Sequence, residues 1–173
     1  GSSSLKVKNS ANLNPTTAMS IEAWVNRTTT AAWRSIISKD SSVGFIQYNF
    51  AINANHQLEF IVNTTGGFHQ FTSAGIVPAG LNHVAATFDG SVFRFYVNGN
   101  IFLDTTVATS TIIPSNFGVT IGNDAVASTP FTGVIDELKI WNTARTENEI
   151  RLNMHTRLAN SSSVNLTAYY RFD

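Results

Sequence analysis

The stretch that decides the fold is LNHVAATFDGSVFRFYVNG, residues 81–99. Apolar and polar side chains alternate on both sides of Asp89-Gly90, and Asn98-Gly99 closes the second run. Both dipeptides readily supply the positive φ values that tight β-hairpins require. The stretch therefore predicts antiparallel strands at 81–88 and 91–98, followed after the second turn by a third strand.

Side-chain alternation also assigns the two faces of the strand at 91–98. Successive side chains of a strand point to opposite faces. We expect Phe93, Phe95 and Val97 to face the core, because all three are apolar. Arg94 and Tyr96 then lie on the opposite, partly solvated face.

Runs of the same kind recur along the chain at the spacing expected of a β-sandwich. We expect the other strands at 20–26, 34–38, 44–52, 57–63, 68–74, 101–107, 118–122, 134–141 and 166–173. One helix is predicted from 146 to 157, because Thr146 and Glu149 form a capping box and Ile150, Met154 and Leu158 share one face. The sequence thus predicts an all-β, two-sheet antiparallel sandwich with one short helix near the C-terminus.

Composition narrows the classes of partner. The chain has 173 residues, which fit a single domain over 1–173, and we interpret the GSSS of residues 1–4 as either the remnant of a tag or the cut end of a domain. Lys and Arg number 11, as do Asp and Glu, so no net charge would attract nucleic acid or anionic lipid. No apolar run reaches the roughly 20 residues that a membrane span needs, so we expect no membrane insertion. Zero cysteines exclude disulfides and thiolate metal sites.

Several segments, in order, carry a resemblance to a known family. They are IEAWV at 21–25, SIISK at 35–39, residues 81–99, TIG at 120–122, FTGVIDELKIWNTARTENEI at 131–150 and LTAYYRFD at 166–173. Together they resemble the laminin-G-like modules of the concanavalin A-like lectin and glucanase superfamily. The resemblance implies a jelly-roll sandwich that is usually a non-catalytic part of a larger secreted or cell-surface protein, here of bacterial type. Such modules bind carbohydrate or protein, often with calcium.

Asp136 is an acid within an apparently buried strand, VIDELKIW. Strict alternation places Asp136 on the same face as Val134, Leu138 and Ile140. A buried carboxylate is costly unless it is paired, hydrogen-bonded or bound to metal. The resemblance implies that Asp136 ligates a structural Ca²⁺ ion, whereas the alternative is that it accepts hydrogen bonds from backbone N–H groups. Both interpretations stay open at this point.

The sequence offers no catalytic pattern. Glucanases of this fold need two closely spaced carboxylates on one strand face, and no E-x-D or D-x-E pattern occurs on a predicted strand. The G-x-S-x-G motif is absent, and the four histidines are dispersed. We therefore predict that the chain is not an enzyme.

Carbohydrate recognition combines aromatic platforms with side chains that hydrogen-bond sugar hydroxyls. Trp33 follows a polar loop and is either such a platform or a buried anchor of that loop. The other candidate ligand-binding residues lie after a glycine turn, on the partly solvated strand face or at the start of a long loop: Phe68, His69, Arg94, Tyr96, Asn123 and Asp124.

The predicted function is a monomeric, lectin-like module of a secreted or cell-surface protein that binds a glycan or polysaccharide, with structural calcium. The alternative is an adhesion module that binds a protein receptor, or a spacer domain without affinity for sugar.

Overall fold

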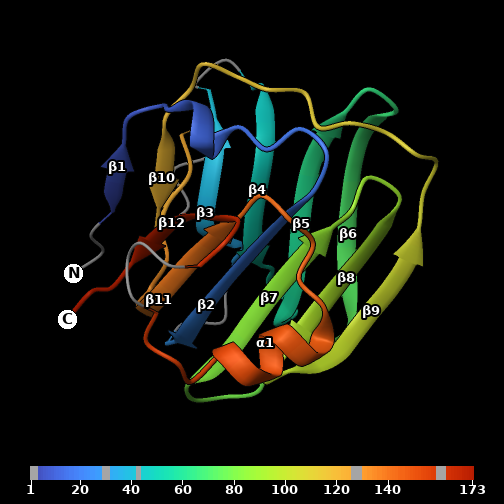
Figure 1. Cartoon of the computed structure of the whole chain (residues 1–173). Helices are drawn as coiled ribbons and strands as arrows, with labels where there is room; N and C mark the ends of the chain where they lie inside the picture. Colours follow the sequence, from blue (N-terminus) through green and yellow to red (C-terminus); the bar gives the residue numbers. More distant parts are fainter. Residues whose placement is uncertain (1–3, 29–31, 42–43, 126–129, 159–162) are drawn as a thin grey trace.

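The computed structural model describes residues 4–28, 32–41, 44–125, 130–158 and 163–173. Two six-stranded antiparallel sheets pack face to face (Figure 1). Sheet A contains, in spatial order, β1 (Leu5–Val7), β10 (Val119–Ile121), β3 (Arg34–Asp40), β4 (Ile46–Ile52), β5 (Gln57–Thr64) and β6 (Gly67–Ile76). Sheet B contains β12 (Leu166–Tyr170), β11 (Gly133–Trp141), β2 (Met19–Arg27), β7 (Asn82–Phe88), β8 (Val92–Val97) and β9 (Asn100–Thr106).

Each predicted strand is confirmed, with ends that differ by a few residues. Two short elements were not predicted: β1 and a 3₁₀ helix at Ala11–Leu13. Each has only three residues, too few for side-chain periodicity to be recognised.

The core lies between the sheets and is rich in aromatic rings. Phe93 and Phe95 of β8 are buried, as the alternation in 91–98 predicts. Phe93 stacks across the sandwich on Phe71 of β6, with ring centroids 4.1 Å apart. Phe95 stacks on Phe50 of β4 in the same way, at 6.2 Å. These contacts fix the two sheets against each other.

Among the described residues, one α-helix, α1 (Glu147–Asn153), packs over part of the outer face of sheet B (Figure 1). The predicted capping box between Thr146 and Glu149 is present, although the helix ends four residues earlier than predicted. Ile150 packs against Ala85 and Tyr96. Within the described part of the chain, no helix is long and apolar enough to cross a membrane.

A β-bulge in β11 corrects the predicted position of Asp136. Asp136 pairs with Trp24 of β2 and Lys139 pairs with Glu22, so β11 carries one extra residue between these pairs. Glu137 takes a positive φ of 50° there. The extra residue reverses the alternation, so Ile135, not Asp136, lies on the core side with Leu138. Asp136 therefore faces outward, and its predicted place among apolar neighbours was wrong.

Candidate functional site

The outer face of sheet A carries mainly small polar side chains. Strand register aligns Ser38, Asn49, Ile61 and Gln70 in one row across β3, β4, β5 and β6. Ser35, Ala51, Glu59 and Thr72 form the next row. Side chains on β3 and β4 are buried, whereas Gln70 and Thr72 on β6 are exposed. The face therefore runs from a buried floor to an open edge.

Trp33 precedes β3 and extends to the second of these rows. Its Nε1–H donates a hydrogen bond of 2.6 Å to Oε1 of Glu59 on β5. The indole is half-buried, and Glu59 is 8% exposed. A hydrogen bond to a charged acceptor is among the stronger ones, so Glu59 fixes the orientation of the indole ring.

Ser35 and Asn49 complete the polar floor beside this pair. Ser35 Oγ donates to Asn49 Oδ1 over 3.2 Å. Ser35 opposes Ala51, which in turn opposes Glu59, so the hydroxyl, the amide and the carboxylate lie on neighbouring strands. Ser35 and Asn49 are buried and support the floor, so the groups that can contact a sugar are the Trp33 ring, the edge of Glu59 and the exposed Gln70 and Thr72.

The predicted pair Asn123 and Asp124 lies at the far end of this face. Ser38 Oγ lies 3.1 Å from Asn123 O and 3.2 Å from Asp40 Oδ1. Asp124 is only 6% exposed, so its predicted place at the surface of an open loop was wrong. Burial raises the pKa of the Asp40 carboxyl, and the negative charge of Asp124 raises it further. Buried packing beside Asp40 thus withdraws Asp124 from solvent.

The hairpin residues Phe68 and His69 point to opposite sides of β6. Phe68 opposes Asn63 on the outer side and is 58% exposed, in agreement with a surface role. His69 opposes Val62, a core residue, and its ring packs against Phe71. His69 Nε2 is buried without a hydrogen-bond partner among the described residues. His69 is therefore half-buried on the inner side of β6 and does not share a face with Phe68, because adjacent strand residues alternate.

Arg94 and Tyr96 lie on the outer face of sheet B, on the opposite side of the sandwich from Trp33. Tyr96 is 1% exposed because α1 covers it, so its predicted contact with solvent was wrong. Arg94 is half-exposed and pairs with Asp104 of β9 at 3.0 Å. Neither residue can contribute to a site on sheet A.

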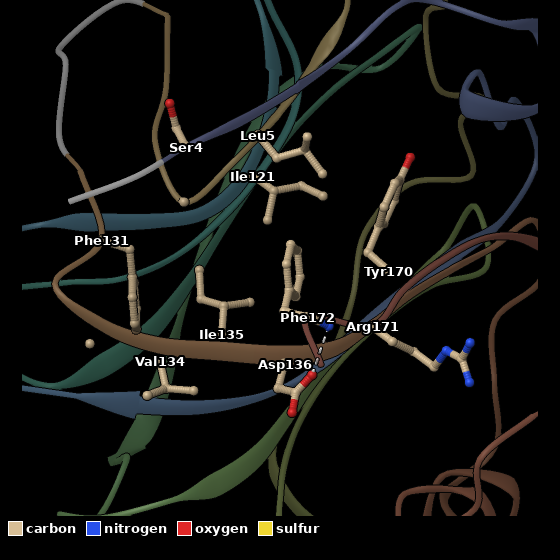
Figure 2. Close-up of a pocket in the computed structure, with 12 residues that line it drawn as sticks. Ser4, Leu5, Ile121, Phe131, Val134, Ile135, Asp136, Tyr170, Arg171 and Phe172 are labelled. Atoms are coloured by element: carbon tan, nitrogen blue, oxygen red, sulfur yellow. Dashed lines mark hydrogen bonds between the residues drawn. The ribbon is translucent and has the colours of Figure 1, made fainter. Parts of the chain in front are cut away.

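Asp136 lies at a pocket between the edges of the two sheets, with a volume of about 610 Å³. Figure 2 shows Ile121, Ile135 and Phe172 facing into this pocket, whereas the Arg171 guanidinium points away from it. Asp136 Oδ1 accepts hydrogen bonds from the backbone N–H groups of Glu137, at 2.8 Å, and Phe172, at 3.2 Å. The carboxylate thus supports the bulge and the segment after β12.

These contacts correspond to the hydrogen-bonded alternative for Asp136. The two backbone N–H groups occupy lone pairs of Asp136 Oδ1 that a cation would otherwise use. Ca²⁺ needs six to eight oxygen ligands. Within the described ranges, no three His, Asp or Glu side chains gather around a common point. The groups beside Asp136 therefore do not fit a calcium centre built on side chains, and its role as a metal ligand stays a prediction.

A family model described as the concanavalin A-like lectin/glucanases superfamily (Laminin_G_3) matches residues 1–151. The chain belongs to this family. No curated protein matches the sequence. This laminin-G-like domain resembles many solved structures. The structures described below share 21% or less of its sequence, so their similarity is one of fold alone.

One similar structure is a Bacteroides ovatus protein thought to bind carbohydrate, with 21% identity and a TM-score of 0.79. The match covers 97% of the domain and 48% of that protein, so the domain spans about half its length. Another is the CBM40 module of a Ruminococcus gnavus IT-sialidase bound to α2,6-sialyllactose, with 16% identity and a TM-score of 0.70 over 88% of the domain and 98% of that chain. A heptameric pentraxin from Limulus polyphemus matches with 15% identity and a TM-score of 0.58, over 86% of the domain and 79% of that chain.

Glu59 and Asn49 are the site residues that sequence reasoning missed. Alternation within QLEFIVN places Leu58, Phe60 and Val62 in the core, and therefore Glu59 on the outer face. That signal was present in the sequence. Its importance depends on Trp33, 26 residues away, and this contact becomes visible only once β3, β4 and β5 are placed side by side.

Proposed function

We propose that this laminin-G-like domain is a non-catalytic carbohydrate-binding module that holds sugar on the outer face of sheet A. The observation that carries the proposal is the Trp33 indole, oriented by Glu59 over a floor of hydroxyl and amide groups. The ring provides an apolar face for sugar C–H groups. Glu59 beside the ring and the exposed Gln70 and Thr72 on β6 provide hydrogen-bonding groups for sugar hydroxyls.

The opposite outer face is less suitable. Helix α1 buries Tyr96 there, and Arg94 is already paired with Asp104. The pocket in Figure 2 is lined largely by apolar side chains, which suit a side chain of a protein receptor better than a sugar. Two of the similar structures carry carbohydrate binding in their descriptions, which adds support for a sugar ligand.

Carboxylate spacing supports binding without catalysis. Glycosidases place their two carboxyl groups roughly 5 to 9.5 Å apart. On sheet A, Glu59 and Asp40 lie two strands apart and near opposite ends of the strand direction. Strand geometry separates their backbones by roughly 19 Å, too far for a catalytic pair.

The proposal extends to where the domain acts. A glycan-binding module needs access to polysaccharide, so we place it in a secreted or cell-surface protein. Structural calcium, with Asp136 as a ligand, stays a separate proposal, distinct from the contact between Trp33 and Glu59.

Replacing Trp33 with alanine tests the site. We expect binding to the best-bound glycan of an array to weaken by about 2 kcal/mol, roughly 30-fold, as for an aromatic residue at the centre of a binding site. Isothermal titration calorimetry measures the affinity, and circular dichroism melting confirms that the variant is folded.

The matched control is Phe172→Ala, which removes an exposed aromatic side chain at the pocket in Figure 2. This variant should retain glycan affinity. Loss of affinity in Phe172→Ala but not in Trp33→Ala would move the site to the pocket and refute the assignment to sheet A. Absence of glycan binding by the wild-type domain would favour a protein receptor.

A further inference from the structure

We infer that the sheet A site selects neutral glycans and rejects glycans that end in a negatively charged sugar such as sialic acid. The inference rests on the proposed function and concerns the charge of the ligand. It departs from the sialyllactose bound by the CBM40 structure, whose similarity to this domain, at 16% identity, is one of fold.

Negative groups dominate the sheet A face. Glu59 lies beside Trp33, where a bound sugar would rest. At the far end of the face, Asp40 accepts from the backbone N–H of Ala125 at 3.1 Å, and the charge of Asp124 acts on it. Glu59 is thus the carboxyl group beside the proposed site, whereas Asp40, with Asp124 next to it, lies roughly 19 Å away at the other end of the face.

Every Asp, Glu, Lys and Arg of the chain lies within the described residues. The residues outside the described ranges are 1–3, 29–31, 42–43, 126–129 and 159–162, and their sequence contains no Asp, Glu, Lys or Arg. These segments therefore add no cationic side chain to the site, wherever they lie. The charge of the face follows from the described residues alone.

The basic residues of sheet A lie away from Glu59. Lys6 occupies the outer side of β1, four strands from β5, which corresponds to roughly 19 Å. That distance exceeds the Debye length of about 8 Å at physiological ionic strength. Lys39 is buried on the inner side, opposite the core residue Tyr48, where its Nζ donates to Phe117 O and Asn9 Oδ1.

Arg34 is the basic residue nearest to Trp33 in the chain. It opposes the core residue Ile52, so its side chain leaves β3 on the inner side. Its Nη1 donates to the carbonyl oxygen of Trp33 at 3.3 Å. The register therefore directs this guanidinium away from the face that carries Glu59.

The ligand preference follows from these charges. Arg27 of β2 donates to the carbonyl oxygens of Ala32 and Asn53, and it shares the inner side of its strand with the core residue Val25. A sialic acid carboxylate near Glu59 would lose water and meet a like charge, with no cationic side chain of the described residues on the outer face beside it to compensate that charge. A neutral sugar can donate a hydroxyl to the Glu59 carboxylate, which gives a stronger, charge-assisted hydrogen bond. The same carboxylate thus attracts neutral sugars and repels acidic ones.

The test is an array of neutral glycans printed beside their α2,3- and α2,6-sialylated forms. We expect the wild-type domain to bind a neutral glycan about tenfold or more tightly than its sialylated partner. Raising the salt concentration should narrow this difference, because salt screens the repulsion. A glycan that ends in an added neutral sugar of similar size, such as galactose, is the control for steric exclusion. If this glycan still binds and the sialylated one does not, the difference is due to charge.

Glu59→Gln isolates the responsible charge. The amide oxygen of glutamine can still accept from Trp33 Nε1–H, so the ring keeps its support while the negative charge is removed. The affinity ratio between neutral and sialylated glycans should fall by about threefold or more. Asp104→Asn removes a carboxylate on the opposite sheet, where it pairs with Arg94, and should leave the ratio unchanged.

The outcomes separate the two proposals. Preferential binding of sialylated glycans would overturn the neutral-ligand inference and leave the carbohydrate-binding function standing. An unchanged ratio in Glu59→Gln would overturn the assignment of selectivity to this carboxylate. Absence of binding to every glycan, charged or neutral, would overturn both.

Discussion

Replacing Glu22 with alanine is expected to destabilise the domain by about 4 kcal/mol, because a buried polar cluster beneath α1 would lose its anion. Glu22 on β2 is 1% exposed. Its Oε1 accepts from Trp141 Nε1–H at 2.9 Å, and His83 Nε2 lies 3.1 Å from its Oε2. Lys139 is its register partner and is itself buried.

The magnitude follows from what alanine leaves behind. The indole N–H of Trp141 would lose its acceptor, which costs about 1 to 3 kcal/mol for a buried group. Removing one member of a buried ionic cluster costs about 3 to 5 kcal/mol, a range that includes this loss. For a chain of this length, about 4 kcal/mol lowers the melting temperature by roughly 8 to 16 °C.

Glu22→Gln separates charge from shape. Glutamine can still accept from Trp141 and fills the same space, so we expect a loss of about 2 kcal/mol at neutral pH. Burial alone would raise the pKa of Glu22, but His83, the charge of Lys139 and the Trp141 N–H together hold it below its ordinary value of 4.5. The stabilisation due to the charge is therefore complete above about pH 4.5 and is lost as the pH falls through the folded-state pKa.

Urea unfolding of wild type, Glu22→Ala and Glu22→Gln at pH 7 and at pH 4 measures these effects. The difference in unfolding free energy between wild type and Glu22→Gln should shrink at the lower pH. A Glu22→Ala variant within about 1 kcal/mol of wild type at pH 7 would refute the view that this carboxylate holds the cluster together.

Two further predictions concern the helix that follows β11 and the bulge within β11. Thr146→Ala should lower the unfolding free energy by about 1 kcal/mol, because it removes the hydroxyl that accepts from Glu149 N–H; Thr146→Ser should recover most of the loss in the same urea titration. Asp136→Ala should cost about 1 to 3 kcal/mol, because Glu137 and Phe172 lose their acceptor. If hydrogen bonding alone explains Asp136, melting of the wild type should be equal in calcium and in chelator; a large rise in melting temperature with calcium would instead establish the metal.

The local sequence pattern predicted the strands because it depends on near neighbours. Asp89-Gly90 and Asn98-Gly99 set the hairpins of β7, β8 and β9, and the alternation between them placed Phe93 and Phe95 in the core. The capping box at Thr146 likewise needs residues only three positions apart. Such features depend on few contacts outside their own segment.

The candidate site was predicted only in part. Trp33 and Phe68 lie on or beside the outer face of sheet A, as a surface role requires. Tyr96 was assigned to a solvated face because alternation reports two sides of a strand but not what covers them. His69 was grouped with Phe68 because both follow the same glycine turn, but the register places it on the inner side of β6, where it is half-buried.

The sequence by itself determined the strands other than the short β1, where the hairpins turn and, where no bulge interrupts a strand, which of its side chains share a face. Only the tertiary structure decided that one extra residue in β11 turns Asp136 outward, that α1 covers Tyr96 and that Trp33 meets Glu59. The physical reason is the distance along the chain over which each interaction acts. Alternation and capping act over a few residues, whereas bulges, helix packing and cross-strand contacts depend on partners that are far apart in the chain and meet only when the sheets assemble.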